Sequence, residues 1–178
     1  MEKLLHVLIV DDSENDALLL VYELKRGGFA PIVERVETAE AMEAALSSKK
    51  WDVVLCDYHM PRFSAFEALE ILKKQGIDIP FIIVSGAVGE ETAVAAMKAG
   101  AHDYIMKDNL TRLVAAIERE LEEAKIRRKQ RETELQLEQS FFDLAETVAR
   151  AMDSRDPYTA GHARKVAEYA QKIGEKMG

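Results

Sequence analysis

Runs rich in apolar residues alternate with amphipathic stretches over the first two thirds of the chain. The runs predict five strands, at His6–Val10, Pro31–Val36, Val53–Cys56, Phe81–Val84 and Asp103–Met106. The stretches between them repeat apolar residues every three to four positions, which predicts helices at Glu14–Arg26, Ala39–Ser48, Ala65–Gln75 and Glu90–Ala99. Because strands and helices alternate with short connections, we expect a parallel sheet covered by helices on both faces.

The pattern changes after Leu110. No glycine or proline occurs from Leu110 to Asp156 and charge is dense, which predicts a helix too long for the compact first part. Apolar residues at alternating four- and three-residue spacing favour a two-stranded coiled coil, with polar residues at three positions of the seam. Its positions are Leu110, Val114, Ile117, Leu121, Ala124, Arg128, Arg131, Leu135, Glu138, Phe142, Ala145, Ala149 and Met152. Two helices with a break near Arg128 are an equally good interpretation.

The last stretch, "SRDPYTAGHARKV" and beyond, opens a new helix. Asp156 can cap it, and Pro157 suits its first turn. We therefore expect three parts: a compact domain at 1–125, a helical linker at 126–154 and a short all-α tail at 155–178.

Acidic residues follow two of the predicted strands. Asp11 and Asp12 end the first run, and Asp57 ends the third. In a doubly wound sheet of order 2-1-3-4-5 these strands are neighbours at the point where the order reverses, which is where such sheets bind ligands. Two carboxylates about 4 Å apart repel by roughly 4 kcal/mol at an effective dielectric near 20. Three ionised carboxylates at one rim would need a cation to offset this repulsion, and their oxygen ligands suit Mg²⁺.

Two further polar residues fall at the same rim. Ser85 ends the fourth run and Lys107 follows the fifth, so a hydroxyl and an ammonium are available for phosphoryl oxygens. An aspartate can accept a phosphoryl group as an acyl phosphate, and Asp57 is the candidate. Alone, each residue has an ordinary explanation as a helix cap, a turn residue or a surface lysine. Their joint placement at four strand ends indicates a site.

Charge and cysteine content limit the partners. The net charge of −8 and the pI near 5.1 argue against nucleic acid and anionic membranes. One cysteine excludes an internal disulfide. The opening apolar stretch Leu4–Val10 is too short to span a bilayer and runs into aspartates rather than a cleavage site. We expect a cytoplasmic protein.

The stretches "VLIVDDSENDALLL", "DVVLCDYHMP", "IPFIIVSG" and "AGAHDYIMKDNL" resemble the receiver domain of two-component response regulators, over about residues 3–125. The resemblance implies a flavodoxin-like (βα)5 fold in which Asp57 takes a phosphoryl group from a sensor histidine kinase. It implies that Asp12, Asp57 and the backbone carbonyl of His59 hold Mg²⁺, with Asp11 acting through water. It also implies that Ser85 and Tyr104 form a paired switch.

The closing segment resembles the opening of HD-GYP domains, metal-dependent phosphodiesterases that act on cyclic di-GMP. The resemblance implies that His162 is an early metal ligand, but one imidazole cannot make a metal site. We therefore expect a non-enzymatic phospho-switch that forms a homodimer through its long helix and alters that pairing when phosphorylated. The alternative is a catalytically incomplete fragment of such a phosphodiesterase. A degenerate receiver that only dimerises is disfavoured by the complete set of site residues.

Overall fold

The computed structural model describes residues 3–86 and 89–153, and its first unit is a five-stranded parallel sheet. The order is β2-β1-β3-β4-β5, which confirms the predicted doubly wound fold. The strands are β1 (Lys3–Val10), β2 (Phe29–Val36), β3 (Val53–Asp57), β4 (Phe81–Ser85) and β5 (Asp103–Met106). The helices are α1 (Glu14–Arg26), α2 (Ala39–Ser48), α3 (Ala65–Lys74), α4 (Glu90–Ala99), the 3-10 helix η1 (Lys107–Arg112) and α5 (Leu113–Asp153).

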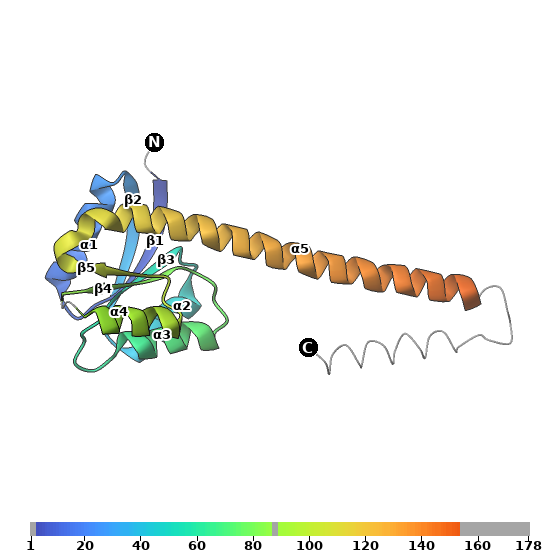
Figure 1. Cartoon of the computed structure of the whole chain (residues 1–178), viewed down its shortest axis with the longest axis horizontal. Coiled ribbons are helices and arrows are strands. Elements are labelled where there is room, and N and C mark those ends of the chain that lie inside the picture. The colour runs from blue at the N-terminus through green and yellow to red at the C-terminus, as the bar shows by residue number, and fades with distance from the viewer. Residues whose placement is uncertain (1–2, 87–88, 154–178) are drawn as a thin grey trace. The chain divides into compact units, whose positions relative to one another are not determined.

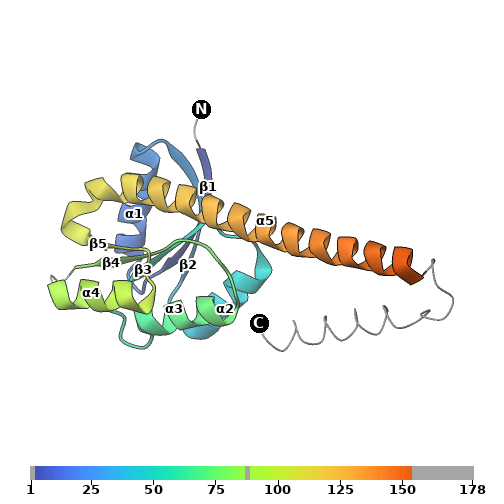
Figure 2. The same cartoon turned by 45° about the vertical axis from the view of Figure 1, so that its right-hand side comes forward.

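Helices cover both faces of the sheet (Figures 1 and 2). One core forms where alternate residues of β1, β3 and β4 pack against α1 and the start of α5. The other forms where the remaining residues of those strands pack against α2, α3 and α4. The central strand β3 is buried along its whole length, so its carboxyl end is held rigidly at the rim of the sheet.

Strand lengths differ from the prediction at their amino ends. β1 begins at Lys3 and β2 at Phe29, earlier than the apolar runs predict. The extra residues of β1 pair only with β2, because β1 pairs with β3 from Val7 onward. These ends are partly open to water, and Leu4 is exposed. Lys3 and Leu4 are exposed, whereas Leu5 and Phe29 are buried, so the strands extend into apolar residues that precede the predicted runs.

A single helix, α5, runs from Leu113 to Asp153, so the continuous-helix interpretation is confirmed and a break near Arg128 is wrong. It begins after Leu110 because Lys107–Arg112 forms the 3-10 helix, in which Asn109 leaves helical geometry. The chain divides into two units between Ile126 and Arg127. Pro157, His162 and the rest of the predicted tail lie outside the described residues.

No helix in the described part of the chain is long and apolar enough to cross a membrane.

Candidate functional site

Three carboxylates meet at the carboxyl ends of β1 and β3. Val10 pairs with Cys56, so the residues that follow them, Asp11 and Asp57, lie side by side at the rim of the sheet. One carboxylate oxygen from each of Asp11, Asp12 and Asp57 lies within 4.8 Å of the others. Asp11 and Asp57 are buried and Asp12 is exposed. Hard oxygen donors at this separation fit a divalent cation such as Mg²⁺, with coordination completed by water.

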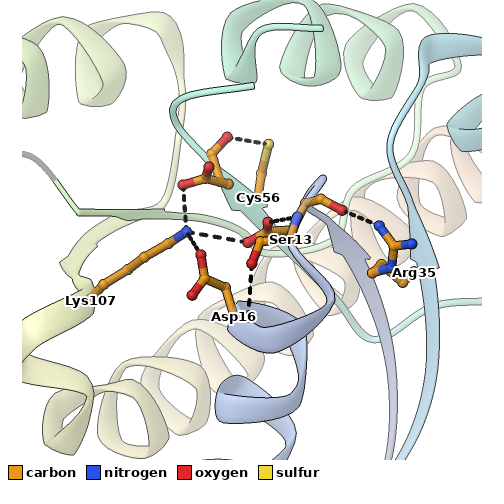
Figure 3. Close-up of polar contacts among 7 residues, drawn as sticks. Ser13, Asp16, Arg35, Cys56 and Lys107 are labelled. Atoms are coloured by element: carbon orange, nitrogen blue, oxygen red, sulfur yellow. Dashed lines mark hydrogen bonds and ion pairs between the residues drawn. The ribbon is translucent and has the colours of Figure 1, made fainter. Parts of the chain in front are cut away.

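Asp11 is fixed by its neighbours. Its Oδ1 accepts a hydrogen bond of 2.8 Å from the Ser13 backbone N–H, and its carbonyl oxygen accepts one of 2.8 Å from Arg35 (Figure 3). Burial raises the pKa of Asp11, and the negative charges of Asp57 and Asp16 add to this. The Ser13 N–H and the Lys107 ammonium lower the pKa but do not cancel the rise. Burial therefore sets the direction of the shift, and a cation bound at the cluster would favour the ionised form of this carboxylate.

Lys107 brings an ammonium group into the cluster from the end of β5. Its Nζ lies 3.1 Å from Asp57 Oδ1, 3.4 Å from Asp11 Oδ2 and 2.7 Å from Asp16 Oδ2. Burial lowers the pKa of Lys107, but hydrogen bonds to Asp16 and Asp57 and the charges of Asp11 and Asp57 outweigh burial and raise it. The side chain is therefore positively charged at neutral pH.

Asp16 is the residue that the sequence analysis missed. It lies in the first turn of α1, where its backbone N–H donates to the Ser13 side chain that caps the helix. An acid in a first helical turn is ordinarily explained by the helix dipole, so its chemistry is hidden in the sequence. The available signal is position: a helix that starts directly after a strand-end acid directs its first turn at the same rim.

The other predicted residues lie on neighbouring elements. Ser85 is buried at the end of β4, next to the position at which Asp57 pairs with Val84. Tyr104 is half-buried on β5 and packs against the core under α2, α3 and α4. His59 is exposed in the loop after β3. A pocket beside the cluster is lined by Asp12, Glu37, Thr38, Met60, Pro61 and Arg62.

Cys56, directly before Asp57, is buried. Burial raises the pKa of its thiol well above the usual range, and the charges of Asp57 and Asp11 add to the effect. The thiol is therefore neutral, and we assign it to the core rather than to the chemistry of the rim.

Comparison with known proteins identifies relatives of the first unit. Residues 7–118 match the model of the "Response regulator receiver domain" family. The nitrogen assimilation regulatory protein NtrX of Azorhizobium caulinodans is 35% identical over 129 residues, which cover 71% of this chain and 28% of that protein. The transcriptional regulatory protein FixJ of Rhizobium meliloti is 40% identical over 114 residues, 64% of this chain and 55% of FixJ. The chain thus spans less than a third of NtrX and about half of FixJ.

Solved structures of the same two kinds of protein are also similar to this chain. A crystal structure of FixJ-N matches with a TM-score of 0.59 and 38% identity, over 68% of this chain and 96% of that one. NtrX from Brucella abortus matches with a TM-score of 0.64 and 29% identity, over 75% of this chain and 30% of that one. The family model matches none of the tail that resembles an HD-GYP domain. The strand order, the aspartate pair after β1, Asp57 at the end of β3 and the matched residues together show that the chain belongs to the response regulator receiver domain family.

Proposed function

We propose that Asp57 accepts a phosphoryl group from a histidine of a sensor kinase in a Mg²⁺-dependent reaction. The observation that carries the proposal is the contact of Asp57 with a charged lysine inside a cluster of three converging carboxylates. An Asp57 oxygen attacks phosphorus, the P–N bond to the donor imidazole breaks, and its electron pair leaves with the imidazole. The Lys107 ammonium then binds a phosphoryl oxygen.

Asp11, Asp12 and Asp57 would hold Mg²⁺, with the His59 carbonyl as a further ligand. The cation would supply positive charge against the phosphoryl oxygens and reduce the repulsion that they meet at this acidic rim. Ser85 and Tyr104 would form the switch: the Ser85 hydroxyl binds the phosphoryl group and the Tyr104 ring turns inward. Placement supports these roles. Ser85 ends β4, the strand next to that of Asp57, and Tyr104 lies on β5, one strand further along the sheet.

The output would be pairing of the long helix. In the described part of the second unit, α5 exposes six large apolar side chains: Leu135, Leu137, Phe141, Phe142, Leu144 and Val148. Leu135 and Phe142 lie on the seam expected from the sequence. The other four are spaced four, three and four residues apart, a second stripe with no polar member. We assign the dimer contact to this second stripe.

Phosphorylation would control this pairing. The names of FixJ and NtrX describe regulatory proteins, and that of FixJ a transcriptional one. For this chain, with its net charge of −8, we propose protein partners rather than nucleic acid. The cyclic di-GMP alternative rests on His162, and no observation in the described residues favours it.

The test is phosphorylation in vitro. The full chain is incubated with acetyl phosphate and Mg²⁺ and its intact mass is measured. We expect one phosphoryl adduct, stable to acid and labile to base, that is absent from Asp57→Asn and absent when the metal is chelated. The exposed Asp108, next to Lys107, offers a control: Asp108→Asn should keep the adduct. An adduct that persists in Asp57→Asn contradicts the proposal.

A further inference from the structure

The Lys107 ammonium has three N–H donors, and three different carboxylates lie around it. Two of these, Asp11 and Asp57, are also members of the candidate cation cluster, whereas the third, Asp16, is not. Asp16 makes the shortest contact, at 2.7 Å, and comes from a different element, α1 (Figure 3). The ammonium is thus shared between the cation site and a separate anchor.

This sharing affects cation binding. An ammonium held only by Asp11 and Asp57 would neutralise two of the oxygens that a divalent cation needs, and would repel that cation. Asp16 offers the ammonium a partner outside the cation cluster. Its side chain is more exposed than those of Asp11 and Asp57, so it is the least costly of the three carboxylates to keep ionised.

The sharing of the Lys107 ammonium also affects phosphoryl transfer. Once Asp57 carries a phosphoryl group, Lys107 has to exchange its bond to Asp57 Oδ1 for one to a phosphoryl oxygen. The bond to Asp16 does not involve either reacting group, so it can persist through the exchange and keep the ammonium aimed at the rim. The partly buried side chain of Lys107 starts at η1, and the Asp16 contact holds its charged end against α1.

We propose that Asp16 is a positioning residue: it holds the Lys107 ammonium on the α1 side of the cation cluster, from where the ammonium also contacts Asp11 and Asp57, so that the cation and then the phosphoryl group can bind there. The inference rests on the proposed function of Asp57. It predicts two separable losses in Asp16→Asn, one in Mg²⁺ affinity and one in the phosphorylation rate at saturating Mg²⁺.

The experiment measures both in the full chain. Mg²⁺ affinity is obtained by calorimetric titration and the rate from intact mass with acetyl phosphate at several Mg²⁺ concentrations. For Asp16→Asn we expect Mg²⁺ to bind several-fold more weakly and the saturated rate to fall roughly tenfold, the scale of one lost hydrogen bond between charged groups. Glu14→Gln is the matched control, since Glu14 is an exposed acid in the same helical turn. It should change neither quantity.

A double-mutant cycle separates positioning from a structural role. In a Lys107→Gln background there is no ammonium to anchor, so adding Asp16→Asn should not lower the saturated rate further. Asp16→Ala provides a second variant that favours the helix. The proposal is wrong if Asp16→Asn and Asp16→Ala match the native chain in both quantities, or if the rate loss is equally large without Lys107. An adduct that survives Asp57→Asn would instead overturn the proposed function itself.

Discussion

Gly27, at the carboxyl end of α1, lies against α5. A Cβ atom added to Gly27 would lie 2.2 Å from Cγ2 and 2.9 Å from Cγ1 of Val114. The backbone there is ordinary (φ −79°, ψ 5°), so it is the close approach to α5, and not a left-handed turn, that requires a glycine. Of the glycines that follow predicted helix ends, Gly28, Gly76 and Gly100 do have positive φ, as a left-handed cap requires.

Gly27→Ala should destabilise the first unit. Val114 has a branched side chain with few rotamers in a helix, so α5 has to shift to admit the methyl group. We expect a net loss of about 1–2 kcal/mol in the free energy of unfolding by urea, after allowing for the entropy that alanine removes from the unfolded chain. In a Val114→Ala background the loss should largely disappear. Equal losses in both backgrounds would show that the contact is not the cause.

Also at the scale of single residues, the sequence predicts which side chains lie close together where strands end. Asp11, Asp57 and Lys107 follow apolar runs, and parallel strands place their carboxyl ends at one rim, so topology alone brings them together. Asp16 could not be found this way. Its contact with Lys107 depends on how the first turn of α1 winds after Asp12, and sequence spacing does not report that winding between distant elements.

At the scale of elements, the start of α3 is a reciprocal cap. The Ser64 backbone N–H and hydroxyl both donate to Glu67 Oε2 at 2.8 Å, and the Glu67 backbone N–H donates to Ser64 Oγ at 3.2 Å. These bonds, from the backbone first and the hydroxyl second, lower the pKa of Glu67 from its usual 4.5. The folded state therefore favours the ionised form, which is stabilising where Glu67 is charged.

The stability difference between the native chain and Glu67→Gln should depend on pH. Because the folded pKa is below 4.5, the stabilisation is fully present above the unfolded pKa and is lost as the pH falls through the folded one. We expect the native chain to melt at a higher temperature near neutral pH, and the difference to vanish at low pH. Glu70→Gln, on the same helix, controls for loss of one acid. A difference that persists unchanged in acid would contradict the cap as its source.

Element boundaries were predictable where capping residues border a helix. α1, α2 and α4 have the predicted bounds: Ser13 caps α1, Thr38 caps α2, and Gly100 ends α4. The edge strand β5 also has its predicted bounds. The amino ends of β1 and β2 were predicted too late, because the ladder begins with the exposed Lys3 opposite the buried Phe29, a pairing that the apolar pattern of one strand does not report. The 3-10 helix η1 was also missed, because Leu110 continues the spacing of α5 although its backbone is not α-helical.

At the scale of the whole molecule, the two units differ in the interactions that stabilise them. The first has two apolar cores and the carboxylate cluster, all within residues up to Ile126. In the described residues of the second, α5 exposes apolar side chains to solvent. Packing of an apolar face supplies most of the stability of protein helices. The sequence predicted the helix and proposed its pairing with a second copy, but spacing alone does not decide which of the two apolar stripes forms the contact.

Leu144→Glu in the full chain should weaken self-association. The stripe of Leu137, Phe141, Leu144 and Val148 would bury Leu144 against a second copy, and a carboxylate there would lose that burial and remain unpaired. We expect sedimentation equilibrium to give a dimer dissociation constant at least about tenfold higher, equivalent to about 1.4 kcal/mol. Gln136→Glu, which adds the same charge outside the stripe, should have little effect. If Leu144→Glu dimerises as tightly as the native chain, the second stripe is not the dimer contact. If the native chain stays monomeric at high concentration, α5 is not a dimer element.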